Sequence, residues 1–351
     1  MEESGEIDKQ AEKIEGEELD HERNFASSVN DAVNRERRPG DPNIKLSFLF
    51  GYHESEKDAE KFKQEVRNSD IVIPEAEEWD EDVLQTYRDV AAGVKTADDV
   101  DEEWGGALSG YSYAQLEALF DTQKKITIVD IPSDYLIAQE SEVGHTDNAY
   151  IDQVLNSTRS NIENIADRHR VREQYMISQI SPKIRELLAN DQQLKVKEDV
   201  NVLMTLGGFH TGVYHAVKKS GYESDRTFDN SPMIYDFKSE GVRKFIFDRE
   251  NKVGDLLLAR IYCEEVFDKL YDREMQSEIR RNSKIAMFKR KVFSMFNLEE
   301  IKNIFNQGNL TPPERLADAM INKGVVIPHS EQEIDELMAK PFVPPNEASA
   351  E

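Results

Sequence analysis

The chain has 351 residues and a formal net charge of −26, because 70 Asp and Glu outnumber 44 Lys and Arg. Sequence-independent binding of nucleic acid depends on a surplus of Lys and Arg, so this composition argues against it. The one cysteine, Cys263, cannot form an internal disulfide, which fits a reducing compartment. The first residues are acidic, and no apolar stretch approaches the ~20 residues of a membrane helix. We therefore expect a cytoplasmic protein without a membrane span, and a homo-oligomer stays open.

Composition divides the chain into four parts. Residues 1–42 are polar and acidic and end in Pro and Gly, which predicts a flexible arm and linker. Alternating strand and helix patterns over 43–250 predict an α/β domain. Residues 251–340 predict a helical extension, and the Pro- and Glu-rich residues 341–351 predict a disordered tail.

The α/β domain begins with a parallel crossover unit. A strand over 44–50 leads into a helix with Phe62 and Val66 on one face, and a short strand follows at 71–73. A β-α-β passage of this length is the smallest unit that joins two parallel strands. Residues 76–112 are acidic and contain a Gly-Gly break, so we expect an irregular insertion or lid.

The middle of the domain is predicted to alternate in the same way. A helix over 114–123 leads to a third strand at 126–129, and a long helix then covers about 158–190. Ser181-Pro182 is expected to kink or divide that helix. A fourth strand follows at 200–206, and its helix is expected to end at Gly221.

The remaining patterns complete the predicted architecture. Short strands near 233–237 and 244–247 are expected to extend the sheet, and helices are expected over 255–276, 279–296 and 312–323. The predicted fold class is therefore α/β, with a mixed, mainly parallel sheet flanked by helices and a helical C-terminal extension.

Two glycine–histidine turns are the most informative motifs. Gly51-Tyr52-His53 and Gly207-Gly208-Phe209-His210 each follow a predicted strand and precede a helix. A glycine lets the backbone turn sharply, and the carboxyl ends of parallel strands form the usual ligand edge of an α/β sheet. We therefore expect His53 and His210 to be two halves of one site.

Carboxylates accompany these histidines at other strand ends. Glu75 and Asp130 close the second and third strands, and Glu54 follows the first histidine directly. Two imidazoles and a carboxylate are a ligand set for a divalent transition metal such as Mn, Co or Zn, with Glu54 as a ligand or general base. The same groups also suit metal-free acid–base catalysis, in which a histidine takes a proton from water. Asp130 is equally well explained as a turn former.

The long helix adds a cluster of arginines. Arg168 and Arg172 share a face, where one of them could bind a substrate carboxylate or phosphate, or orient Glu75 through a bidentate bond. The spacing alone favours the alternative, an exposed cationic stripe paired with Asp167 and Glu173. The sequence contains neither a phosphate-binding Gly-rich loop nor a Gly-x-Ser-x-Gly nucleophile elbow.

At these residues the chain resembles the TIKI/TraB proteins together with erythromycin esterase-like and ChaN-like proteins. The resemblance covers about residues 44–225 and depends on the order and spacing of several motifs together. These motifs are Gly51-Tyr52-His53, Asp70-Ile71-Val72-Ile73-Pro74-Glu75, Arg172-Glu173-Gln174-Tyr175-Met176, Gly207-Gly208-Phe209-His210 and Lys219-Ser220-Gly221-Tyr222.

The resemblance implies an α/β fold in which the paired histidines and the glutamate form one pocket, and it favours Arg172 over Arg168 as the pocket arginine. Functions in the superfamily diverge. TIKI proteins are described as metal-dependent proteases, and erythromycin esterases hydrolyse a lactone using a histidine. ChaN-like proteins bind haem, and TraB proteins are linked to the shutdown of peptide pheromones. The fold does not choose among these functions.

Three hypotheses follow. The first is a divalent-metal-dependent hydrolase of a peptide, amide or ester bond, with His53, Glu75 and His210 around the metal or activated water. Glu54 would assist proton transfer, and Arg172 would orient the substrate or stabilise developing charge. The second is a ligand-binding or regulatory protein without catalysis, for a peptide or, as the less favoured cofactor, haem. The third is a helical partner-binding protein with an inactive pocket.

Overall fold

The computed structural model describes residues 42–51, 56–106, 108, 110–135, 151–228, 236–247, 253–271, 284–306 and 310–339. Nearly all of the predicted N-terminal arm and the whole predicted C-terminal tail lie outside these residues. So does the segment that carries His53 and Glu54.

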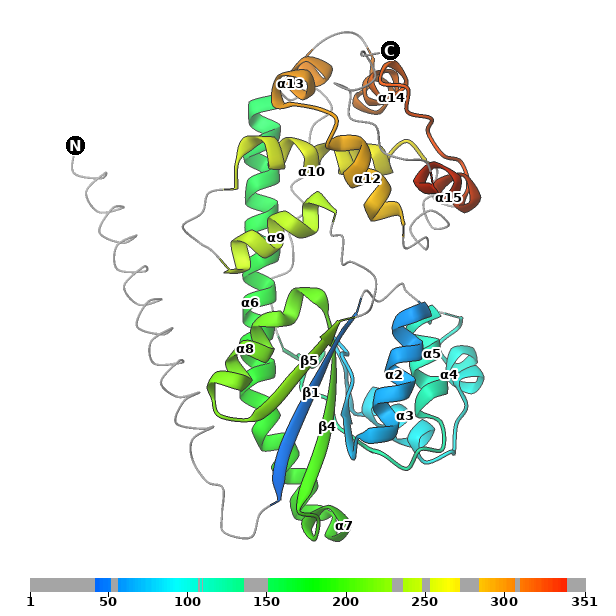
Figure 1. Ribbon diagram of the computed structural model, residues 1–351, viewed down its shortest axis with the longest axis vertical. Coiled ribbons are helices and arrows are strands. Elements are labelled where there is room, and N and C mark those ends of the chain that lie inside the picture. The colour runs from blue at the N-terminus through cyan, green and yellow to red at the C-terminus, as the bar shows by residue number, and fades with distance from the viewer. Residues whose placement is uncertain are drawn as a thin grey trace, which may run out of the picture.

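The centre of the fold is a sheet of parallel strands (Figure 1). The strand order is β3-β2-β4-β1-β5, and every pairing between these strands is parallel. The predicted α/β class with a mainly parallel sheet is therefore confirmed. The strands are β1 (Asn43–Gly51), β2 (Ile71–Ile73), β3 (Lys125–Ile126), β4 (Asp199–Gly207) and β5 (Glu223–Phe228).

The register of the central strands places the glycines that end β1 and β4 side by side. β1 and β4 pair along their whole lengths, and Gly51 lies opposite Gly207 at the last position. Both strands are apolar runs because helices cover the sheet on both faces, as parallel sheets require. The two strands therefore end at the same edge of the sheet, and the residues that follow Gly51 in the first turn lie outside the described residues.

Helices cover the two faces of the sheet. Leu49 and Val72 pack with one group of helices, whereas Phe48 and Phe50 point the other way and pack against α6 and α8. The first group contains α2 (Glu56–Asn68), α3 (Glu81–Ala91), α4 (Ala97–Glu103) and α5 (Gly110–Leu119). The helices near the opposite face are α6 (Ile151–Asn190), the short α7 (Gln192–Lys195) and α8 (Thr211–Lys219).

The prediction of an irregular insertion over 76–112 is wrong. This stretch forms α3 and α4 and the start of α5, and Leu84, Val90 and Val100 from it are buried in the core. Its acidic residues occupy exposed faces and helix starts. Asp80 caps α3, and Thr96 begins α4 with a capping box. The acidic composition therefore concealed ordinary amphipathic helices.

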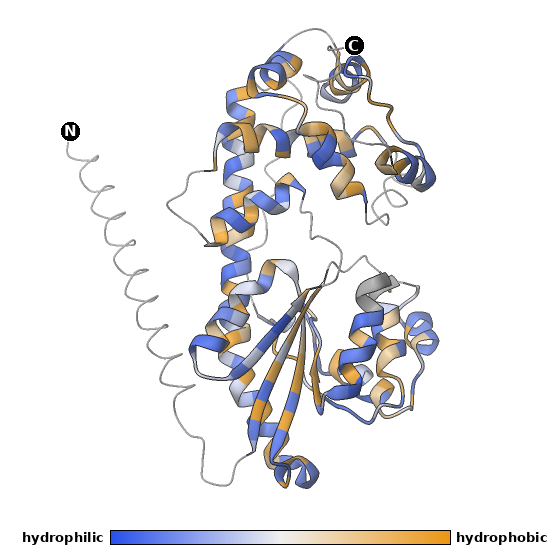
Figure 2. Cartoon of the chain, viewed as in Figure 1, coloured by the Kyte–Doolittle hydropathy of each residue, from blue (hydrophilic) through white to orange (hydrophobic). Residues whose placement is uncertain are grey.

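A second layer contains helices and no strand among its described residues, and it has its own core. It surrounds the first half of α6, from which Val154 and Ile162 pack with Phe267 and Phe293. Its helices mix apolar and hydrophilic residues, as amphipathic helices do (Figure 2). They are α9 (Phe237–Phe247), α10 (Asp255–Asp268), α12 (Ile285–Phe293), α13 (Leu298–Asn306), α14 (Pro312–Asn322) and α15 (Glu331–Ala339).

Several predicted boundaries need correction. The expected strand at 244–247 is part of helix α9, and the fifth strand of the sheet is instead residues 223–228. The third strand pairs only over Lys125–Ile126, although the buried chain continues to Ile131. Short apolar runs do not distinguish a strand from a buried helix, which explains the error at α9.

Helix α6 connects the two layers (Figure 1). It begins at Ile151, earlier than predicted, and Ser181-Pro182 does not divide it. The packing of Ile180 and Ile184 on the sheet supports the helix on either side of the proline. No helix in the described part of the chain is long and apolar enough to cross a membrane.

Candidate functional site

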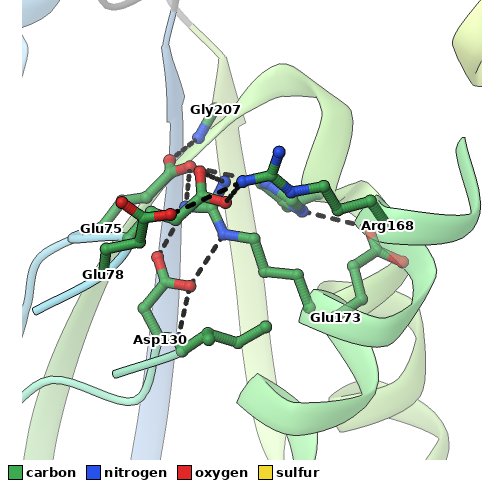
Figure 3. Close-up of polar contacts among 10 residues, drawn as sticks. Glu75, Glu78, Asp130, Arg168, Glu173 and Gly207 are labelled. Atoms are coloured by element: carbon green, nitrogen blue, oxygen red, sulfur yellow. Dashed lines mark hydrogen bonds and ion pairs between the residues drawn. The ribbon is translucent and has the colours of Figure 1, made fainter. Parts of the chain in front are cut away.

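Arg172 of α6 is the centre of a buried ionic cluster at the carboxyl edge of the sheet. Figure 3 shows the polar contacts of this cluster, with Glu75 and Asp130 labelled. Nε and Nη2 of Arg172 donate to both oxygens of Asp130, at 2.8 and 2.6 Å. Its Nη2 also donates to Oε1 of Glu75 at 2.7 Å, and its Nη1 lies 3.1 Å from Oε2 of Glu77. The guanidinium is therefore held by three carboxylates from the ends of two strands.

The charges around Arg172 fix its protonation state. Burial by itself would lower the pKa of the guanidinium, but the hydrogen bond with Asp130 and the negative charges of Glu75, Asp130 and Glu77 outweigh it. The net result is a pKa above the ordinary value of arginine. Arg172 is a permanent cation that holds the carboxylates in place.

Asp130 and Glu75 are also fixed by the backbone. The Asp130 side chain accepts the Ile131 N–H at 2.8 Å, and its carbonyl accepts the indole N–H of Trp79 at 2.7 Å. Glu75 accepts the N–H of Gly207 through Oε2. The glycine turn that ends β4 is thus bonded directly to the glutamate that follows β2.

His210 lies between two carboxylates. It ends the 3-10 turn η1 (Gly208–His210) that follows β4, and it is 1 % exposed. Its Nε2 is 3.5 Å from Oε1 of Glu75, and its Nδ1 is 3.5 Å from Oε1 of Glu173. Nδ1 of His210 and Oε1 of Glu173 are both buried without a hydrogen bond in the described structure. These distances leave room for the pair to tighten when a ligand binds.

Glu173 is a site residue that the sequence reasoning did not select. It follows Arg172 in α6 and is buried, with 10 % of its side chain exposed. The signal that could have found it is helical spacing, because His169, Arg172, Glu173 and the buried Met176 form one i, i+3, i+4, i+7 stripe. That stripe faces the sheet edge.

Gly212 makes room for Glu173 at the start of α8. A Cβ at position 212 would lie 2.4 Å from Oε2 of Glu173, well inside the contact distance. We therefore expect Gly212→Ala to displace the Glu173 carboxylate and to lower the free energy of unfolding by about 1–3 kcal/mol, measured by urea denaturation. Gly254→Ala is the comparison, because a Cβ there meets nothing within 4 Å and only the smaller cost of alanine at a helix N-cap remains. Equal effects of the two substitutions would contradict this account.

His169 supplies a second imidazole beside His210. Its ring stacks on Phe209 with centroids 5.2 Å apart and lies 5.2 Å from the ring of His210. Burial, together with the charges of His210 and Arg172, lowers the pKa of His169 to about 3. His169 is therefore neutral at physiological pH, and it was not selected from the sequence.

The helical layer also contacts the glycine turn. Arg243 of α9 donates to the carbonyl oxygen of Gly208. Arg170 of α6 donates to the carbonyl oxygen of Phe245, which is also in α9. Both contacts are part-buried. The turn that carries His210 is therefore held from the sheet side by Glu75 and from the helical side by Arg243.

The structure brings four of the predicted residues together: Glu75, Asp130, Arg172 and His210. His53 and Glu54 lie outside the described residues. Arg168 is at the periphery, 30 % exposed in its side chain, and pairs with Glu77 at 3.2 Å. Arg168 and Arg172 form ion pairs with Glu75, Glu77, Glu78 and Asp130, whereas the spacing favoured Glu173 as a partner.

The same contacts show which of these side chains are available to hold a metal ion. Within the described residues, no group of three or more His, Cys, Asp or Glu side chains is arranged to hold a metal ion. The Glu75 carboxylate, one of the expected ligands, is already bound by Arg172 and by the N–H of Gly207. The described residues therefore do not fit a metal site by themselves.

Comparisons with known proteins add nothing to these contacts. No family model, curated protein or solved structure matches this chain. The resemblance to TIKI/TraB and erythromycin esterase-like proteins consequently depends on the sequence motifs alone.

Proposed function

We propose that this protein is a hydrolase of a peptide, amide or ester bond, in which His210 is the general base that removes a proton from water. The observation that carries the proposal is the position of His210 between Glu75 and Glu173, with each ring nitrogen 3.5 Å from a carboxylate oxygen. In this proposal Glu173, beside Nδ1, orients the ring and stabilises its cationic form, and Nε2 on the Glu75 side takes the proton from water.

The surrounding contacts support different roles for the two carboxylates. Glu75 is tied to Arg172 and Gly207, so it belongs to the fixed frame of the site. Oε1 of Glu173 has no hydrogen bond and lies 3.5 Å from Nδ1 of His210, so it can form a hydrogen bond there as positive charge develops on the ring. Arg172 acts as a positioning residue in this proposal, since its donors are directed at carboxylates rather than at a free ligand position.

A divalent metal belongs to the same proposal only if His53 and Glu54 supply further ligands. Such an ion would polarise a carbonyl group or lower the pKa of a bound water. His210 could contribute a ring nitrogen to it, because its Nδ1 has no hydrogen bond in the described structure, and the same holds for Nδ1 of the neighbouring His169. The catalytic roles argued above for His210 and Glu173 do not depend on that ion.

The proposal is tested by assaying the full chain against a panel of peptide, anilide and ester substrates, with Glu173→Gln as the diagnostic variant. We expect hydrolysis by the wild-type protein, and a loss of about tenfold or more in kcat/KM for the variant, because glutamine cannot stabilise the imidazolium form. Glu186→Gln on the same helix is the control, since the Glu186 side chain is 61 % exposed. No hydrolysis of any substrate, or equal activity of the two variants, would contradict the proposal.

The burial of His210 favours a second candidate, which is ligand binding without turnover. A histidine that is 1 % exposed and enclosed by carboxylates can serve as a fixed recognition group. Peptide is the preferred ligand class and haem the less favoured one. Tight binding of a peptide that the wild-type protein leaves intact distinguishes this candidate, and a Soret band that is lost in His210→Gln identifies haem.

A further inference from the structure

An exposed apolar surface lies beside the ionic cluster. Tyr135 is 43 % exposed and Val171 is 38 % exposed. The rings of Tyr135 and Tyr175 meet edge to face at a centroid distance of 5.0 Å. Val171 and Tyr175 are four residues apart on α6 and therefore share a face. We call Tyr135, Val171 and Tyr175 the Tyr135 face.

Two glutamates form an acidic rim next to this face. The side chains of Glu77 and Glu78 are 35 % and 73 % exposed, and both lie near the Arg168 guanidinium, at 3.2 and 3.8 Å. Arg168 precedes Val171 by one helical turn, so the rim adjoins the Tyr135 face. The backbone N–H of Glu78 donates to Ile131 at 2.9 Å, which ties the rim to the segment that leads to Tyr135.

The charge of the whole region is negative. Five carboxylates, from Glu75, Glu77, Glu78, Asp130 and Glu173, lie around the guanidinium groups of Arg168 and Arg172 and the His210 ring. Inside the cluster, the nine-tenths buried Glu173 keeps an oxygen without a hydrogen bond. A ligand with a positive charge reduces this imbalance, whereas a carboxylate or phosphate increases it. Of the two roles expected for an arginine here, the contacts of Arg172 match the orientation of Glu75.

We propose that the Tyr135 face and the acidic rim form a recognition subsite for a peptide in which an aromatic or aliphatic side chain adjoins a lysine or arginine. The apolar side chain covers Tyr135, Val171 and Tyr175, and the cation lies at Glu77 and Glu78. This inference deepens the proposed function by naming the substrate class, and its turnover depends on that function. The binding itself does not depend on catalysis.

Binding is tested with three capped, dye-labelled hexapeptides that differ only in a central Phe-Lys, Phe-Glu or Ser-Lys pair, by fluorescence anisotropy at low salt. We expect Phe-Lys to bind about tenfold more tightly than Phe-Glu and about fivefold more tightly than Ser-Lys. The double variant Glu77→Gln, Glu78→Gln should reduce the first ratio at least about threefold, because it removes the rim charge. Glu186→Gln should leave that ratio unchanged.

The apolar part has its own matched pair of variants. Tyr135→Ser should remove the preference for Phe-Lys over Ser-Lys, whereas Phe120→Ser should preserve it, since both aromatic residues are 43 % exposed. Equal binding of Phe-Lys and Phe-Glu, equal effects of the two serine variants, or no binding of any peptide overturns the inference. Selective binding without hydrolysis supports it while removing the hydrolase proposal. Hydrolysis at rates that do not depend on the charge of the peptide supports the hydrolase proposal and overturns this inference.

Discussion

His210→Gln is expected to lower kcat/KM by about 10²–10⁴-fold on the substrate that the wild-type protein hydrolyses fastest. Glutamine is close to histidine in size and keeps hydrogen-bonding capacity toward Glu75 and Glu173, so most of the packing survives. It cannot take a proton from water at neutral pH, which is the function that we assign to the imidazole. Steady-state kinetics with the purified full chain measure the loss.

The control for this variant is His215→Gln. His215 is an exposed residue of α8, only five positions along the chain, and it contacts Arg226 rather than the cluster. It should retain wild-type activity. Thermal unfolding of both variants separates a loss of chemistry from a loss of fold. An active His210→Gln protein, with more than about half of the wild-type kcat/KM, would exclude His210 as the general base.

Arg172→Met is expected to produce the largest loss of stability, about 3–5 kcal/mol in the free energy of unfolding. Methionine preserves the length and apolar stem of the side chain but leaves Glu75, Asp130 and Glu77 without their shared cation. Because protonation of these carboxylates removes the unpaired charge, the deficit relative to wild type should be smaller at pH 5 than at pH 8. Urea denaturation at both pH values measures it.

Arg168→Met provides the comparison. Arg168 also pairs with Glu77, but its side chain is 30 % exposed, and water screens the pair. The expected loss is below about 1 kcal/mol, with little dependence on pH. A similar cost for both substitutions would show that burial of the Arg172 cluster contributes nothing, and a deficit that grows toward pH 5 would reverse the argument about unpaired carboxylates.

Local patterns in the sequence were sufficient for the frame of the site. The apolar runs of β1 and β4 identified central parallel strands, and the residues after strand ends included Glu75, Asp130 and His210. These predictions succeeded because side-chain period and strand polarity are local properties, and parallel strands bring their carboxyl ends to one edge. The role of Arg172 was selected only through the family resemblance.

Other parts of the site could not be predicted in this way. Glu173 becomes significant because α6 crosses the sheet edge beside His210, and Gly212 because Glu173 lies against it. His169 becomes neutral because the fold buries it beside His210 and Arg172. Each depends on a contact between residues far apart in the chain, and helical spacing alone does not show which face of a helix meets a site.

The residue pattern by itself determined the parallel α/β sheet, the edge at which its polar residues gather, and three of the residues found there, which are Glu75, Asp130 and His210. The tertiary structure decided how those residues pair: Arg172 holds the carboxylates of Glu75 and Asp130, and His210 faces Glu75 on one side and Glu173 on the other. The physical reason is that strand order and hydrophobic period are encoded locally, whereas charge pairing and burial arise only when α6 packs across the sheet.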